Sequence, residues 1–95
     1  MNAIAISQPV LDKLKDKHAV DKREIEQCFD NRDGGFLMDN REDHRTDPPT
    51  LWFIAQTNCG RLLKVVFISI DGKVHIKTAY EPNDTEIGIY DRHGK

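Results

Sequence analysis

The chain has 95 residues, of which 32% are charged and 38% hydrophobic, and its formal net charge is −2 at pH 7. This length predicts one domain, residues 1–95, with a small core. The near-neutral charge excludes a generally basic surface, so any anion site must be a local patch. The two cysteines have no C-x-x-C spacing, which predicts a reduced, cytoplasmic protein without a zinc site of the usual kind. The N-terminal segment has no long apolar run and no small-residue cleavage site, so we expect no signal peptide and no membrane span. The sequence has no Gly-rich phosphate loop and no acidic cluster that clearly makes a magnesium site, so we expect no metal ion or other cofactor.

Two helices are predicted in the first third of the chain. Ser7 can cap the first helix and Pro9 lies in its first turn, and the helix should end near Lys17-His18. Asp21 and Glu24 have the spacing of a capping box and should open the second helix. The expected buried positions of the two helices are Val10, Leu11, Leu14, Ile25, Cys28 and Phe29.

Residues 36–38 could form a short edge strand, and residues 39–49, DNREDHRTDPP, predict a charged loop. Three strands then follow within residues 50–80. The Asp71-Gly72 dipeptide indicates a two-residue hairpin that pairs Ile70 with Lys73. Asn58-Cys59-Gly60 indicates a three-residue loop that pairs Thr57 with Arg61. These turns predict the pairs Phe53–Val65, Leu51–Phe67, Phe67–Ile76, Val65–Thr78 and Leu63–Tyr80.

Strand alternation then sorts the side chains onto two faces. One face is apolar and should be the core: Leu51, Phe53, Ala55, Leu63, Val65, Phe67, Val74 and Ile76. The other face is half apolar and half basic: Trp52, Ile54, Lys64, Val66, Ile68, His75 and Lys77. Its large apolar groups suggest that something covers it.

A last helix should begin at Asn83, which has Glu86 at capping-box spacing, with Ile87 and Tyr90 facing inward. The predicted fold is therefore α+β: two N-terminal helices, an antiparallel meander sheet of three to four strands, and a C-terminal helix. We expect the helices to cover the core face.

Basic side chains on the second face are the first candidates for function. Lys64, His75 and Lys77 should point the same way, with Arg61 at the mouth of the sheet. Such cations can hold a phosphate and stabilise a charged transition state. The alternative is that the lysines extend over apolar surface without a chemical role.

Aromatic and loop residues supply the other candidates. Trp52 could stack on a base or anchor a partner. Tyr80 ends the last strand, where its hydroxyl could reach a cleft from the core-face side, although a buried tyrosine with a bonded hydroxyl is the commoner case. In the loop, His44 could act as general acid or base. Arg41 and Arg45 could bind phosphate, unless the loop is only a solvated charged segment.

The order of several motifs is similar to that of one known family. These motifs are Lys17-His18-x-Val20, Glu24 with Phe29, a charged loop, Gly60-Arg61-Leu62-Leu63-Lys64-Val65-Val66, Ile76-x-Thr78-Ala79, and Glu86 with Tyr90. Over roughly residues 15–90 the chain resembles the BrnT-like toxins of bacterial type II toxin–antitoxin pairs, which have a RelE-like ribonuclease fold. Arg61 and Lys64 match the basic part of the family's central strand, whereas Tyr80 stands where the family usually has an arginine.

This resemblance implies a cytoplasmic endoribonuclease that cleaves RNA without a metal ion, by attack of the 2′-hydroxyl on the adjacent phosphate. Lys64 with His44, His75 or Tyr80 would be catalytic, and Arg41, Arg45, Trp52, Arg61 and Lys77 would bind RNA. The implied partners are RNA, on or off the ribosome, and a cognate antitoxin, for which a ribbon-helix-helix protein is one option. A homodimer and a heterotetramer with antitoxin both stay open.

Two other functions remain as alternatives. A non-catalytic module of the same fold could bind a protein through Trp52, Ile54, Val66 and Ile68. The segments HRTDPPTLWFIA and KTAYEP are also similar to small bacterial proteins labelled ADP-ribosyl-(dinitrogen reductase) hydrolase. That activity is associated with a larger all-helical fold that holds two magnesium ions. We rank it last, because this chain has neither the length nor the acidic ligands.

Overall fold

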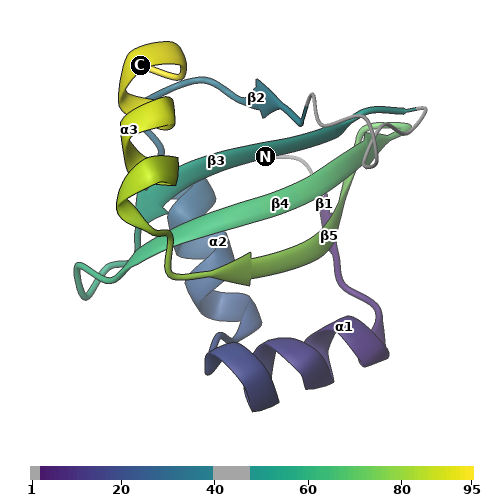
Figure 1. The fold of residues 1–95 in the computed structure, drawn as a ribbon. Coiled ribbons are helices and arrows are strands. Elements are labelled where there is room, and N and C mark those ends of the chain that lie inside the picture. The colour runs from purple at the N-terminus through teal and green to yellow at the C-terminus, as the bar shows by residue number, and fades with distance from the viewer. Residues whose placement is uncertain (1–2, 40–47) are drawn as a thin grey trace.

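The computed structural model describes residues 3–39 and 48–95 and has an α+β fold (Figure 1). Its elements, in chain order, are β1 (Ala3–Ala5), α1 (Gln8–Lys13), the π-helical η1 (Leu14–His18), α2 (Lys22–Asn31), β2 (Leu37–Met38), β3 (Thr50–Gln56), β4 (Leu62–Ile70), β5 (Lys73–Tyr80) and α3 (Asp84–His93). The predicted fold class is confirmed. None of the helices in the described ranges is both long and apolar enough to cross a bilayer.

The sheet is larger than predicted. Its strand order is β1-β5-β4-β3-β2, and β1 pairs with β5 in parallel while the other neighbours are antiparallel. The sheet is therefore five-stranded and mixed rather than a purely antiparallel meander. Strand β1 is only three residues long, Ala3–Ala5, and so gives no alternating pattern that could be recognised.

Both predicted capping boxes are present. The Asp21 carboxylate accepts from the Glu24 N–H at 2.9 Å, and the Asn83 side chain accepts from the Glu86 N–H at 2.8 Å. Ser7 occupies the N-cap position of α1 but makes no side-chain capping bond. The first helix ends at His18 as expected, where Ala19 turns into the left-handed region with φ of 51°.

The two predicted turns also set the pairing of the strands. Asp71 and Gly72 both have positive φ, as a type I′ hairpin turn requires, and Ile70 pairs with Lys73. Gly60 has φ of 85°, and the Thr57 N–H donates to the Arg61 carbonyl at 2.8 Å. The predicted pairing of β3 with β4, including Phe53–Val65 and Leu51–Phe67, is confirmed.

The predicted pairing of β4 with β5 is correct from the hairpin turn as far as the pair Phe67–Ile76. Beyond that pair, to the end of β5, it is wrong. The register shifts between Val66 and Phe67, so Lys77 has no paired residue. Such an extra residue is a β-bulge, which moves the following side chains to the other face. The predicted pairs Val65–Thr78 and Leu63–Tyr80 are therefore wrong. Instead, the observed pairs beyond the bulge are Val66–Thr78, Val65–Ala79 and Lys64–Tyr80.

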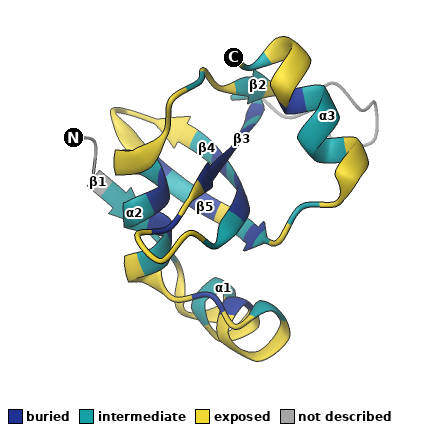
Figure 2. Ribbon diagram, turned by 90° about the vertical axis from the view of Figure 1, so that its left-hand side faces the viewer, coloured by how far each residue is buried: buried dark blue, intermediate teal, exposed yellow. Residues whose placement is uncertain are grey.

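The helices lie on both sides of the sheet, as Figure 2 shows for α2 and α3. Helix α2 packs on the core face against β3 and β4, and η1 adds the fully buried Leu14 to the same core. Helix α3 contacts β3 from the other face, where the Tyr90 ring lies 5.8 Å from the Trp52 ring. The expectation that all helices cover the core face is wrong for α3, which covers part of the second face.

The end of α3 is held against the segment that follows α2. The Tyr90 hydroxyl donates to the Gly35 carbonyl at 2.8 Å, and the Gly35 N–H donates to the Gly94 carbonyl at 2.6 Å. A Cβ atom added at Gly34 would lie 2.6 Å from the Tyr90 hydroxyl and 2.7 Å from the Gly94 carbonyl oxygen. Gly34 is therefore needed for the close approach of the two segments.

Replacing Gly34 with alanine should destabilise the protein by about 1–3 kcal/mol, because the added methyl group overpacks this contact. Gly35→Ala is the matched control, since its Cβ would meet only the Gly94 carbonyl oxygen, at an ordinary 3.6 Å. Urea denaturation of the two variants measures the difference. Equal stability of the two variants would contradict the close contact at Gly34.

Candidate functional site

A cleft of about 250 Å³ opens on the second face of the sheet. It brings together residues from α1, β3, β4 and β5 with the residue that follows β2. Four of the predicted site residues line it: Trp52, Lys64, Lys77 and Tyr80. The other lining residues are Lys13, Asp39, Thr50, Val66 and Thr78.

Lys64 is the most buried charge of this cleft, with only 9% of its surface exposed. Its Nζ atom lies 2.6 Å from Oε2 of Glu86 and 4.5 Å from the centre of the Trp52 ring. Removing an ammonium group from water costs free energy unless a counter-charge and hydrogen bonds replace the solvent. Glu86 and the face of the Trp52 ring supply that replacement.

Glu86 connects the cleft to the start of α3. Its Oε2 accepts from Lys64 and, at 2.8 Å, from the Tyr80 hydroxyl, while Oε1 accepts from the Asn83 N–H at 3.0 Å. Burial alone would raise the pKa of this carboxyl, but the hydrogen bonds from Lys64, from the backbone at Asn83 and from Tyr80 outweigh it and lower the pKa below 4.5. Glu86 is therefore ionised at neutral pH.

The sequence assigned Glu86 only a capping role and did not predict its place in the site. A carboxylate in a capping box has one oxygen turned back to the N-cap, which leaves the other free to accept further bonds. The sequence gives no sign that Lys64 and Tyr80 would be the donors, because the β-bulge decides that Tyr80 faces this way.

Tyr80 is a proton donor at neutral pH. Burial raises its pKa above 10.0, the hydrogen bond to Glu86 raises it further, and the nearby Lys64 charge lowers it only in part. The Tyr80 ring also lies 5.7 Å from the His18 ring. The phenol thus keeps its proton and points it at Glu86 in the free protein.

Trp52 lies deeper than the sequence suggested. Its side chain belongs to the buried set with 8% exposure, below the Lys64 ammonium group and against the Tyr90 ring. It therefore contributes to the site through its contact with the Lys64 charge rather than as an open stacking surface.

Arg61 does not line this cleft and is engaged by other parts of the fold. Its guanidinium donates to the carbonyls of His18 and Ala19 at 2.8 and 2.7 Å, and pairs with Glu24 and Glu81 at 3.1 Å each. Burial opposes its charge, but the two carboxylates raise its pKa. Arg61 thus joins the end of η1 to α2 and to the end of β5.

The remaining predicted residues lie elsewhere. His75 pairs with Ile68, five residues from Tyr80 and so roughly 16 Å along the strand, and it does not line the cleft. Arg41, His44 and Arg45 lie outside the described residues. Within the described ranges, no three His, Cys, Asp or Glu side chains gather as ligands for a metal ion.

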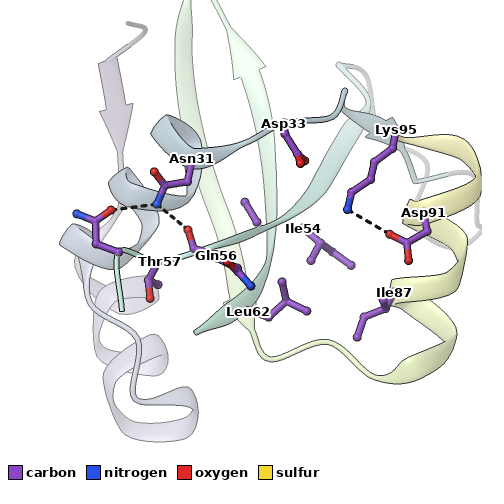
Figure 3. A pocket seen from close by; sticks show the side chains of 11 residues that line it. Asn31, Asp33, Ile54, Gln56, Thr57, Leu62, Ile87, Asp91 and Lys95 are labelled. Atoms are coloured by element: carbon purple, nitrogen blue, oxygen red, sulfur yellow. Dashed lines mark hydrogen bonds and ion pairs between the residues drawn. The ribbon is translucent and has the colours of Figure 1, made fainter. Parts of the chain in front are cut away.

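A larger cavity of about 630 Å³ lies between the end of α2, the end of β3 and α3 (Figure 3). Ile54, Leu62 and Ile87 form its apolar part, and an ion pair between Asp91 and Lys95 lies at its rim. Among the residues that the structure describes, none of the predicted catalytic or RNA-binding residues lines this cavity, although Ile54 of the alternative protein-binding surface does. The cleft beside Lys64 and Tyr80 is therefore the candidate site.

Comparison with protein-family models finds no match for this chain, and comparison with curated proteins finds no significant relative.

The lowered pKa of Glu86 predicts how the free energy of unfolding depends on pH. A carboxyl whose pKa is lower in the folded state stabilises the fold above its unfolded pKa, and this stabilisation is lost as the pH falls through the folded pKa. Glu86→Gln removes the titrating group. Its free energy of unfolding should therefore fall less steeply than that of the wild type as the pH is lowered from about 5. Urea titrations with Asp91→Asn as the exposed control measure this, and parallel slopes in wild type and Glu86→Gln would refute the assignment.

Arg61→Lys should lower the free energy of unfolding by about 1–3 kcal/mol, because a single ammonium group cannot reach both carbonyls and both carboxylates. Arg92→Lys is the control, since Arg92 is exposed and its one side-chain hydrogen bond in the described structure goes to the Gly88 carbonyl. Thermal denaturation compares the two. An Arg61→Lys protein as stable as the wild type would show that these contacts contribute little.

Proposed function

We propose that the protein is an RNA-cleaving enzyme and the toxin component of a type II toxin–antitoxin pair, neutralised by a cognate antitoxin. The observation that carries this proposal is the placement of Lys64 beside Tyr80 in a cleft that also contains Lys13 and Lys77. Phosphodiester cleavage needs cations for the phosphate and a proton donor for the leaving oxygen. The resemblance of residues 15–90 to BrnT-like toxins adds support.

The proposed reaction is transfer within the RNA strand. The 2′-oxygen attacks the adjacent phosphorus, the bond from phosphorus to the 5′-oxygen breaks, and a 2′,3′-cyclic phosphate and a 5′-hydroxyl form. Lys64 and Lys77 stabilise the negative charge on the phosphate, and Tyr80 gives its proton to the 5′-oxygen. His44 is the candidate from the sequence for the base that takes the 2′-hydroxyl proton.

Glu86 acts in this proposal as a positioning residue. It does not line the cleft, but it holds both Lys64 and Tyr80 through the same oxygen. A bound phosphate would compete with Glu86 for the Lys64 ammonium group. It would therefore weaken the hydrogen bonds that the carboxylate accepts from Lys64 and Tyr80. Because Glu86 holds both groups beside the cleft, they are already in place before the substrate arrives, and such preorganisation favours electrostatic stabilisation of a transition state.

The burial of the second face favours this proposal over the non-catalytic binding module. That module would use Trp52, Ile54, Val66 and Ile68 as a contact surface, but Trp52 and Ile54 are buried. In Figure 3 the Ile54 and Ile87 side chains line the same cavity, so α3 lies opposite this part of the face. Only the half-buried Val66 and Ile68 remain for a partner.

Tyr80→Phe tests the proposal most directly, because it removes the proposed acid and keeps the ring. We expect RNA cleavage to fall by about 100-fold or more, with a loss of stability of about 1 kcal/mol from the missing hydrogen bond. Cleavage of a labelled single-stranded RNA by purified protein, in the presence of EDTA, measures the rate.

Tyr90→Phe is the matched control. It also removes a hydroxyl that donates a 2.8 Å hydrogen bond, but this bond goes to Gly35 and not to the cleft. Tyr90→Phe should therefore cleave RNA at nearly the wild-type rate. The proposal fails if the wild-type protein leaves RNA intact, or if Tyr80→Phe cleaves as fast as Tyr90→Phe.

A further inference from the structure

A second concave site lies on the core face of the sheet, away from the cleft of Lys64 and Tyr80. This pocket has a volume of about 390 Å³. Six of its lining residues are apolar and come from four strands, from α2 and from the segment between α2 and β2: Ile4, Phe29, Phe36, Leu51, Phe67 and Val74. Among the described residues, Arg32 and Ser69 add polar side chains to the lining.

The apolar walls of this pocket are left partly uncovered by the fold. Helix α2 ends at Asn31, and Phe36, which follows it, is 42% exposed. Met38 pairs with Leu51, so it faces the same side of the sheet, and it is 53% exposed. Exposed apolar groups around a hollow commonly mark a binding site in a small domain.

Three aromatic rings pack against one another in the wall of this pocket. The Phe36 ring lies 5.0 Å from the Phe67 ring and 6.3 Å from the Phe29 ring, and the Phe29 and Phe67 rings are 5.5 Å apart. These edge contacts are the favourable geometry for aromatic pairs. The three rings therefore contact one another and form one continuous apolar wall.

Arg32 places a positive charge at this wall. Its guanidinium lies 4.2 Å from the centre of the Phe36 ring and donates to the Gly34 carbonyl. Among the described residues no carboxylate forms an ion pair with it. A planar guanidinium with remaining N–H donors is suited to a carboxylate.

We propose that this pocket binds a small amphipathic acid, with its alkyl or aryl body against Phe29, Phe36 and Phe67 and its carboxylate on Arg32. The volume lies within the range of about 300–1,000 Å³ typical of small-molecule sites, and such sites combine apolar walls with a few polar groups. This site is independent of the proposed RNA cleavage, because it lies on the other face of the sheet.

Octanoate and 1-octanol are the probes, since they share the alkyl chain and differ in charge. Titration of the ¹⁵N-labelled full chain, followed by amide chemical shifts, should give saturable octanoate binding with a Kd below about 1 mM. The shifts should map to the residues around Phe36 and Phe67. Octanol should bind at least tenfold more weakly.

Two variants and one control locate the site. Arg32→Gln should weaken octanoate at least tenfold and leave octanol unchanged. Ser69→Trp should abolish binding of both probes, because Ser69 is exposed and lines the pocket. Ile70→Trp is the control, since Ile70 is 41% exposed and alternation places it on the opposite face of β4.

The native amide spectrum of each variant verifies that it is folded. The proposal is overturned if octanoate does not saturate at several millimolar, if octanol binds as tightly, if the shifts map away from the pocket, or if Ser69→Trp binds like Ile70→Trp. RNA cleavage can be present or absent in any of these cases, so the two proposals fail separately.

Discussion

The carboxylate of Glu86 is the interaction on which the candidate site depends. One oxygen caps the first turn of α3 at Asn83, and the other accepts from Lys64 and Tyr80. It therefore ties the helix on the second face to two neighbouring strands. Without this negative charge, the almost buried Lys64 ammonium group against Trp52 would lose the carboxylate that it pairs with at 2.6 Å, which is unfavourable. Stability of α3 and the geometry of the cleft are thus set by the same group.

Much of the fold could be predicted because the decisive signals are local. Positive φ at Asp71, Gly72 and Gly60 follows from the turn residues, and each turn fixes the adjacent strand pairing. Each of the two capping boxes can be predicted from two residues that lie three positions apart in the sequence. The placement of Lys64 on the face opposite the core also follows from these turns, and it proved correct.

The rest depends on long-range packing. The bulge at Lys77 inserts one residue without a turn signal, and its only trace is that two polar residues, Lys77 and Thr78, separate the buried Ile76 and Ala79. That single residue brings Tyr80 next to Lys64. Helix α3 packs against β3, and Arg61 binds the end of η1 and Glu24 of α2. In both cases the partners are far apart in the sequence. The three residues of β1 are too few to form a pattern.

A double-mutant cycle between Lys64 and Glu86 tests the central claim most directly. The free energies of unfolding of the wild type, Lys64→Met, Glu86→Gln and the double variant are measured by urea denaturation at pH 7. If the pair is the connection between α3 and the sheet, its coupling energy should be about 1–3 kcal/mol. If the two single effects add to within about 0.5 kcal/mol, Lys64 and Glu86 act independently and the account of the site is wrong.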